Sequence, residues 1–125
     1  MKDQQIIIVT RDRTFRDALR RTCTDQGCHV ESAGSVADAR ELSTRMPVCV
    51  VISDNTLHSP DDGLQLARDI RGDHPDVTCF LIADHDNGEH EDAMKDEAWM
   101  RIVRKPIRML RFSADIVDVV AKSTL

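Results

Sequence analysis

Aromatic side chains are scarce in this chain of 125 residues, which has no tyrosine, one tryptophan and three phenylalanines. Few rings are therefore available to stack on a flavin, so a flavin-binding protein is not the favoured interpretation. The expected strand-to-helix turn at residues 10–14 has no glycine, although a helix N-terminus there could cradle an anion. An anion or flavin binder stays open as the least favoured alternative.

The chain also lacks the marks of a secreted or membrane protein. Its first apolar run, Ile6–Val9, is too short for the core of a signal peptide or for a membrane span. The four cysteines form no CxxC pair, and Cys49 and Cys79 lie inside apolar runs, where a free cysteine acts as a small hydrophobe. We therefore expect a cytoplasmic protein with no disulfide framework and no membrane partner.

Charge and length restrict the function further. The formal net charge of -5 argues against direct binding to nucleic acid. No Ser-His-Asp or Cys-His arrangement stands out, so an enzyme is not expected. A chain of 125 residues builds one hydrophobic core, and we expect a single domain over residues 1–125.

Apolar residues occur in continuous runs, which are typical of parallel strands covered on both faces. The runs are Ile6–Val9, His29–Val30, Val48–Ile52, Cys79–Ala83 and Ile102–Val103. Helical patterns separate them over residues 14–26, from a cap at residue 35 onward, and over residues 64–70, 89–98 and 107–120. Strands that alternate with helices predict an α/β fold with a doubly wound, five-stranded parallel sheet.

In such a sheet, ligands bind beyond the carboxyl ends of the strands, at the point where the strand order reverses. Several polar or small residues directly follow or end the predicted strands. They are Thr10, Arg11, Asp12, Asp54, Ala83 and Lys105. Periodicity alone therefore predicts that these residues gather at one rim of the sheet.

Two apolar runs end in a characteristic way, one on Asp54 and the other on the pair Lys105-Pro106. Pro60 and Gly63 lie between Asp54 and Lys105-Pro106, and all four features occur in the same order in a known protein family. This pattern resembles the receiver domain of two-component response regulators, which is CheY-like. The resemblance implies the strand order 2-1-3-4-5, a phosphoacceptor position at Asp54, and a Lys105 that pairs first with that carboxylate and then with phosphate.

The resemblance also exposes a departure at the end of the first strand. The family has an acidic pair there, whose second member is the principal Mg²⁺ ligand, and the matching residues are Thr10 and Arg11. Arg11, Asp54 and Lys105 sum to a formal charge of +1, against -2 for the family's usual set, and Asp12 can return it to zero. Unit charges about 4 Å apart interact by about 4 kcal/mol at an effective dielectric of about 20. We therefore expect Mg²⁺ binding to be lost and Arg11 to pair with Asp54, the alternative being an Arg11 that extends into solvent.

Two further positions differ from the family pattern. Ala83 matches a threonine or serine whose hydroxyl meets the phosphate, and Ile102 matches an aromatic residue that reports phosphorylation. The loop Asn55–Asp62 also carries one residue more than is usual in the family. These losses favour a pseudo-receiver that acts in phosphorelay signalling through protein–protein contact. The alternatives are a phospho-accepting receiver that uses Asp54 in an unorthodox pocket, and a flavodoxin-like anion or flavin binder.

The resemblance places the usual partner surface on the fourth helix, fifth strand and fifth helix. Candidate residues for contact with a sensor histidine kinase or another signalling protein are Trp99, Arg101, Ile102, Arg104, Arg108 and Arg111. An exposed Trp99 would anchor a partner, whereas a buried one would belong to the core. Ordinary surface charge is the alternative interpretation of the arginines. His85 and His90, in an acidic stretch, could bind Zn²⁺ or Ni²⁺ or could simply be solvated.

Overall fold

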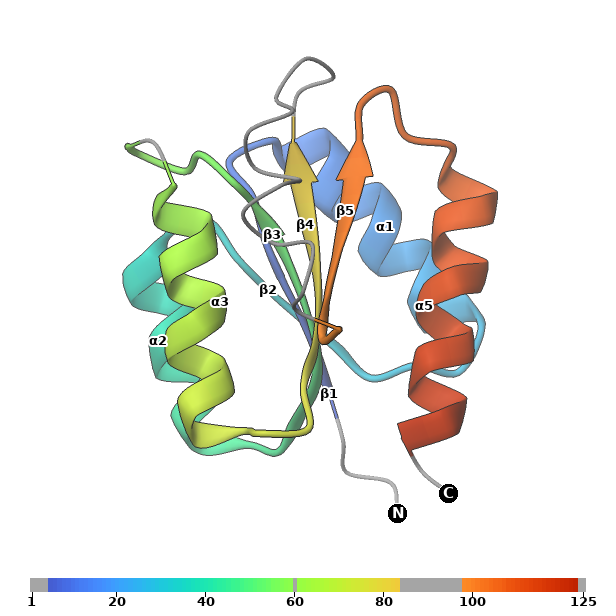
Figure 1. Ribbon diagram of the computed structural model, residues 1–125. Helices are drawn as coiled ribbons and strands as arrows, with labels where there is room; N and C mark the ends of the chain where they lie inside the picture. The colour runs from blue at the N-terminus through green and yellow to red at the C-terminus, as the bar shows by residue number, and fades with distance from the viewer. Residues whose placement is uncertain (1–4, 60, 84–97, 124–125) are drawn as a thin grey trace.

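The computed structural model describes residues 5–59, 61–83 and 98–123 (Figure 1). Its elements, in chain order, are β1 (Gln5–Val9), α1 (Arg13–Asp25), β2 (Val30–Ala33), α2 (Val36–Arg45), β3 (Val48–Asp54), α3 (Asp62–Asp73), β4 (Thr78–Ala83), β5 (Met100–Arg104) and α5 (Met109–Ser123). The strands form one parallel sheet in the order β2-β1-β3-β4-β5. The predicted fold class and strand order are therefore confirmed.

Some sequence predictions fall where the structure gives no description. The helix expected over residues 89–98 lies outside the described residues except for Ala98. Pro60, His85 and His90 also lie outside them. No helix in the described part of the chain is long and apolar enough to cross a membrane.

The helix ends follow local capping chemistry. The Oδ1 atom of Asp12 accepts the N–H of Phe15 at 3.0 Å, so α1 begins one residue before the predicted start. Gly27, at φ 90°, follows α1 and donates its N–H to the Thr24 carbonyl at 3.0 Å. Ser35 caps α2 as predicted, because its hydroxyl accepts the N–H of Asp38 at 3.2 Å.

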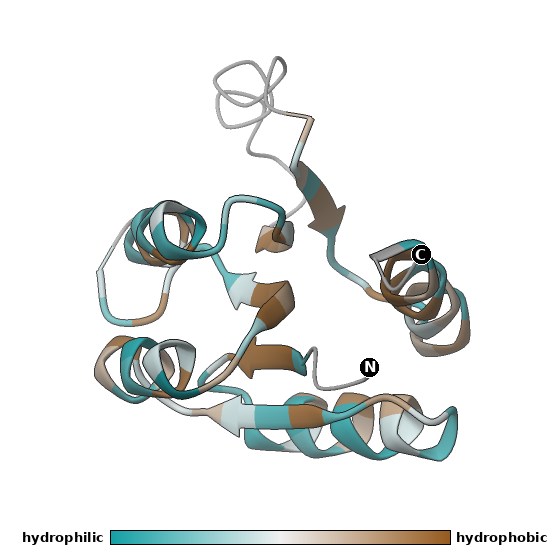
Figure 2. Ribbon diagram, turned by 90° about the horizontal axis from the view of Figure 1, so that it is seen from below, coloured by the Kyte–Doolittle hydropathy of each residue, from teal (hydrophilic) through white to brown (hydrophobic). Residues whose placement is uncertain are grey.

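The sheet is the middle of three layers. Helices α1 and α5 cover one face and α2 and α3 cover the other (Figure 1). Successive residues of β3 face opposite layers: Val51 packs towards α2 and α3, whereas Val50 and Ile52 pack towards α1 and α5. Both faces of the strand are thus buried, which explains its continuous apolar run and the apolar colour of the strands in Figure 2.

The four cysteines are free thiols, and three of them are buried. Cys23 and Cys49 belong to the layer between the sheet and α1 and α5, and Cys79 to the opposite layer. Burial raises the pKa of Cys23 to about 12 and that of Cys49 to about 11. Cys49 and Cys79 are therefore core residues, as the apolar runs around them predict, and Cys23 joins the core from α1.

The start of α3 packs directly on the end of β3, and Gly63 makes this possible. A Cβ atom at Gly63 would lie 1.6 Å from the carbonyl oxygen of Asp54 and 2.8 Å from Oγ of Ser53. The backbone carbonyl of Gly63 accepts a hydrogen bond from that hydroxyl at 3.2 Å, and its N–H donates to the Asn55 carbonyl at 2.9 Å. The glycine therefore sets how closely the helix approaches the strand that carries Asp54.

We expect Gly63→Ala to destabilise the protein by more than about 3 kcal/mol, because the new methyl group meets backbone atoms that cannot move aside. Gly72→Ala is the matched control, since Gly72 lies in the same helix and a methyl group added there would have nothing within 4 Å. That change should leave stability within about 1 kcal/mol of the wild type. Urea unfolding measures both, and equal effects of the two substitutions would contradict this account.

Candidate functional site

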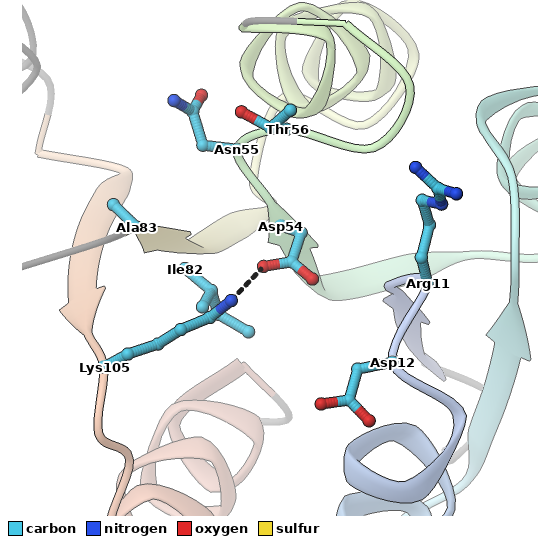
Figure 3. Close-up of a pocket in the computed structure, with 8 residues that line it drawn as sticks. All are labelled: Arg11, Asp12, Asp54, Asn55, Thr56, Ile82, Ala83 and Lys105. Carbon is cyan, nitrogen blue, oxygen red and sulfur yellow. Dashed lines mark ion pairs between the residues drawn. The ribbon is translucent and has the colours of Figure 1, made fainter.

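The carboxyl ends of β1, β3, β4 and β5 surround one cavity of about 450 Å³ (Figure 3). Its lining residues are Arg11, Asp12, Asp54, Asn55, Thr56, Ile82, Ala83 and Lys105. Five of the six residues predicted for the rim line this cavity, and the sixth, Thr10, is fully buried beside it. The position of the cavity follows from the sheet order, which reverses between β1 and β3.

Both carboxylate oxygens of Asp54 have partners. The Thr10 hydroxyl donates a short hydrogen bond to Oδ2. The Nζ atom of Lys105 lies 3.6 Å from Oδ1, an ion pair rather than a close hydrogen bond, drawn as a dashed line in Figure 3. The Asp54 side chain is 14% exposed, so these two groups replace most of the water that a free carboxylate would bind.

Lys105 reaches this position from the end of β5. Its backbone N–H donates to the Ala83 carbonyl at 3.2 Å, which extends the pairing of β4 and β5 by one residue. The Lys105-Pro106 peptide bond is cis. The lysine side chain is 51% exposed and can therefore leave the carboxylate at a small free-energy cost.

The predicted ion pair between Arg11 and Asp54 is wrong. The Nη1 atom of Arg11 instead donates to the backbone carbonyl of Leu57 at 3.0 Å. Figure 3 shows the guanidinium turned away from Asp54. The physical reason is competition for acceptors: Asp54 is already engaged, whereas the loop after β3 offers a carbonyl that Arg11 can reach from the end of β1.

Thr10 has a role that the sequence reasoning missed. Its hydroxyl accepts the N–H of Asp12 at 3.1 Å while it donates to Asp54, and its carbonyl accepts from Nη1 of Arg16 at 3.0 Å. The signal was the strand register: Val9 pairs with Ser53, so the next residues along β1 and β3 are Thr10 and Asp54. Thr10 thereby joins the end of β1, the start of α1 and the acidic side chain of β3.

Asp62 holds the loop between β3 and α3 in place. The sequence reasoning did not predict this role. Its carboxylate accepts three backbone N–H groups, from Leu57 at 2.6 Å, His58 at 2.8 Å and Ser59 at 3.1 Å. Burial alone would raise the pKa of Asp62, but these donors and the nearby His58 outweigh it and hold the pKa below its usual value. Two charged side chains therefore hold the loop: Asp62 accepts its backbone N–H groups, and Arg11 donates to its Leu57 carbonyl.

The remaining predicted residues are spread over different surroundings. Ala83 is buried at the cavity wall, and Ile102 is half-buried against the layer that contains α2 and α3. Trp99 is also half-buried in that layer, with the Arg71 guanidinium 4.8 Å from its ring centroid. Trp99 is therefore neither fully exposed nor a member of the buried core, and its part in a partner surface stays a prediction.

The predicted basic group is not one cluster. Arg101 lies near the start of β5, where it lines a separate cavity with Val119 and Lys122 from the far end of α5. Arg108 directly precedes the opposite end of α5, Arg111 lies in the first turn of that helix, and both are exposed. Because α5 rises about 1.5 Å per residue, the two ends are more than about 15 Å apart. Arg104, at the end of β5, is half-buried.

The model of the response regulator receiver domain family matches residues 6–117. This chain belongs to that family. The hydrogenase transcriptional regulatory protein HoxA of Cupriavidus necator is 29% identical over 100 residues, which make up 78% of this chain and 20% of that protein. The chain thus spans about a fifth of that relative. Receiver domains are signalling modules that relay signals from histidine kinases and other signalling proteins.

Solved structures agree with the fold. A response regulator receiver protein from Sinorhizobium medicae WSM419 has a TM-score of 0.77 at 24% identity, over 97% of this chain and 94% of that one. A CheY-like receiver domain protein from Methanospirillum hungatei JF-1 has a TM-score of 0.83 at 16% identity, over 97% and 96% of the two chains. At these identities the likeness establishes the receiver fold and leaves the chemistry of the rim to the residues themselves.

We expect Thr10→Val to destabilise this receiver domain by about 1–3 kcal/mol, because it leaves an Asp54 oxygen and the Asp12 N–H without their partner. Thr10→Ser is the matched control: it keeps the hydroxyl and loses one methyl group, at a cost of about 1 kcal/mol. Urea unfolding measures both variants. A Thr10→Val protein as stable as the wild type would show that the hydroxyl does not hold Asp54.

Asp62→Ala should destabilise the domain by about 1–3 kcal/mol at neutral pH, because it leaves the N–H groups of Leu57, His58 and Ser59 without their charged acceptor. Because the pKa of Asp62 is lowered in the folded state, its contribution is complete above the ordinary value of 3.8 and disappears as the pH falls below it. The free energies of unfolding of the wild type and of Asp62→Ala should therefore converge in that acidic range. Asp17→Ala, which removes an exposed carboxylate from α1, is the control for the loss of one negative charge at each pH. Urea unfolding at several pH values tests the prediction.

Proposed function

We propose that this receiver domain is a pseudo-receiver, which signals through protein contacts without phosphorylation of Asp54 and without Mg²⁺. The observation that carries the proposal is the position of Arg11. A guanidinium stands at the end of β1, where the family resemblance calls for the principal carboxylate ligand, and it is fixed to the Leu57 carbonyl. Four charged side chains line the cavity, Arg11 and Lys105 against Asp12 and Asp54, and their formal charges cancel.

The residues present do not fit a bound Mg²⁺ ion. This ion needs several oxygen ligands in a near-octahedral arrangement. One oxygen of Asp12 caps α1, and both oxygens of Asp54 are engaged by Thr10 and Lys105. The permanent charge of Arg11 adds repulsion in the same cavity. The donor set of the rim is therefore incomplete, and its charge is unfavourable for a second cation.

The same contacts disfavour phosphoryl transfer to Asp54. An attacking carboxylate oxygen must be free to face the phosphorus, and negative charge on the transferred group must be neutralised. Thr10 holds one oxygen, and Ala83 offers no hydroxyl to the product. A phospho-accepting receiver remains the second candidate, since Lys105 lies 3.6 Å from Asp54 and the carboxylate opens onto the 450 Å³ cavity.

The partner is, in this proposal, a sensor histidine kinase or another signalling protein in the cytoplasm, with no direct nucleic acid or membrane contact by this domain. The surface best suited to it lies over the end of β5 and the start of α5. Arg108 and Arg111 stand on either side of Leu110 in the chain, Leu110 is 80% exposed, and Arg104 ends the neighbouring strand β5. Ile102 is half-buried against the layer that contains α2 and α3 and adds little to this surface. An exposed apolar side chain between cations suits an acidic partner surface with a central apolar contact.

The proposal predicts that millimolar Mg²⁺ leaves the amide NMR shifts around Asp54 unchanged and that acetyl phosphate adds no phosphoryl group detectable by intact mass. Arg11→Asp should gain saturable Mg²⁺ shifts at Asp12, Asp54 and Asn55, because it exchanges a repelling guanidinium for a carboxylate ligand. Arg13→Asp is the matched control: it makes the same charge change on α1, at a residue that does not line the cavity, and should not respond.

Two results would contradict the proposal. One is a localised, saturable Mg²⁺ response in the wild type. The other is a phosphoryl adduct on the wild type that is absent from Asp54→Asn, which would establish the phospho-accepting alternative. If Arg11→Asp and Arg13→Asp gain equal Mg²⁺ responses, overall charge rather than the rim ligand set governs binding.

A further inference from the structure

A second, smaller cavity adjoins the rim between α1 and the start of α5. Its volume is about 240 Å³. The lining residues are Thr10, Asp12, Phe15, Asp54, Ile82, Lys105, Pro106 and Ile107. Four of them supply apolar walls, in contrast to the cavity of Figure 3, in which charged and polar residues predominate. We name the cavity lined by these eight residues the apolar crevice. It lies beside the point where the strand order reverses, which is the usual ligand position in such sheets.

The charges around the apolar crevice are unequal. Asp12 and Asp54 line it with -2, and Lys105 contributes +1, so their sum is -1. Arg11 helps to neutralise the charge of the larger cavity, but it does not line the crevice. Its guanidinium donates to the Leu57 carbonyl. The side chains that line the crevice therefore carry a net charge of -1, in contrast to the neutral rim next to it. Arg16, which does not line the crevice, donates to the Thr10 carbonyl at 3.0 Å.

Asp12 is the carboxylate with capacity for a ligand. Its Oδ1 accepts the N–H of Phe15, and its second oxygen has no partner among the described residues. In Figure 3 the carboxylate points away from Arg11. Asp54, by contrast, already has partners on both oxygens. The Phe15 side chain adds an aromatic wall, whose ring face also favours a cation.

We propose that the apolar crevice binds a small organic amine. The protonated amine pairs with Asp12, and an apolar body of ring size packs against Phe15, Ile82 and Ile107. The volume of about 240 Å³ lies below the range of about 300–1,000 Å³ of most ligand pockets, so the ligand is smaller than a nucleotide or a flavin. Binding would place a chemical signal in contact with Lys105 and with the segment that starts α5. This inference is independent of whether Asp54 accepts a phosphoryl group.

The test uses three probes of the same shape and different charge: benzylamine, benzyl alcohol and benzoate. Each is titrated into the isotope-labelled domain and followed by amide and methyl NMR shifts. Benzylamine should give saturable shifts at Phe15, Ile82 and Ile107 with a millimolar dissociation constant, as expected for a ligand of this size. Benzyl alcohol should bind more weakly, and benzoate most weakly of the three.

Asp12→Asn is the informative variant, because asparagine caps helices as well as aspartate does and removes only the charge. It should weaken benzylamine binding by about two- to fivefold, the effect of one partly exposed ion pair, and leave benzyl alcohol unchanged. Asp17→Asn is the matched control: it removes the same charge from the same helix, at a residue outside the crevice. It should bind benzylamine as the wild type does.

Three results would overturn the proposal: no saturable benzylamine shifts at the crevice up to about 10 mM, benzoate binding as tight as that of benzylamine, or equal weakening by Asp12→Asn and Asp17→Asn. The first would show that the crevice holds no such ligand, and the other two that the Asp12 carboxylate does not select a cation. The comparison of the three probes on the wild type needs no variant, so it decides the question even if Asp12→Asn fails to fold. None of these measurements involves Mg²⁺ or a phosphodonor, so they succeed or fail separately from the pseudo-receiver proposal.

Discussion

The organisation of the rim depends on the need to compensate a largely buried carboxylate at the end of β3. Asp54 is 14% exposed, and an unpaired charge at that depth would be costly. The compensating groups belong to the chain: a neutral hydroxyl from Thr10 and a half-exposed ammonium from Lys105. Because both carboxylate oxygens are satisfied without a metal, Arg11 does not need to pair with Asp54. The guanidinium is then available to hold another part of the structure.

That other part is the loop between β3 and α3. Asp62 gathers three backbone N–H groups of the loop, and Arg11 takes its Leu57 carbonyl. Gly63 brings the helix against the backbone of Asp54 itself. Asp62 thus connects the loop that follows Asp54 to α3. The Arg11 guanidinium links the end of β1 to the Leu57 carbonyl of the same loop.

Sequence periodicity predicted the layers, the Ser35 cap and the gathering of the rim residues, and the family resemblance implied the strand order, since these features depend on burial and on short-range hydrogen bonds. Neither predicted where Arg11 points. The flexible Arg11 side chain can reach more than one hydrogen-bond acceptor. The Leu57 carbonyl becomes one of them only when the loop has folded around Asp62. The double role of Thr10 requires the register of β1 on β3, and the separation of Arg101 from Arg111 requires the direction of α5.

A ligand shifts a two-state protein only through a difference in its interactions with the two states. In the proposed pseudo-receiver this difference is small at the rim, because Asp54 is already paired and the charges of the four lining residues cancel. The apolar crevice is different: it has a net charge, an Asp12 oxygen with no partner among the described residues, and walls from both α1 and the segment leading into α5. Lys105 lines both cavities and is half-exposed, so it can respond to either. Under the two proposals, the crevice and Lys105, rather than the carboxylate of Asp54, couple a chemical signal to the exposed start of α5.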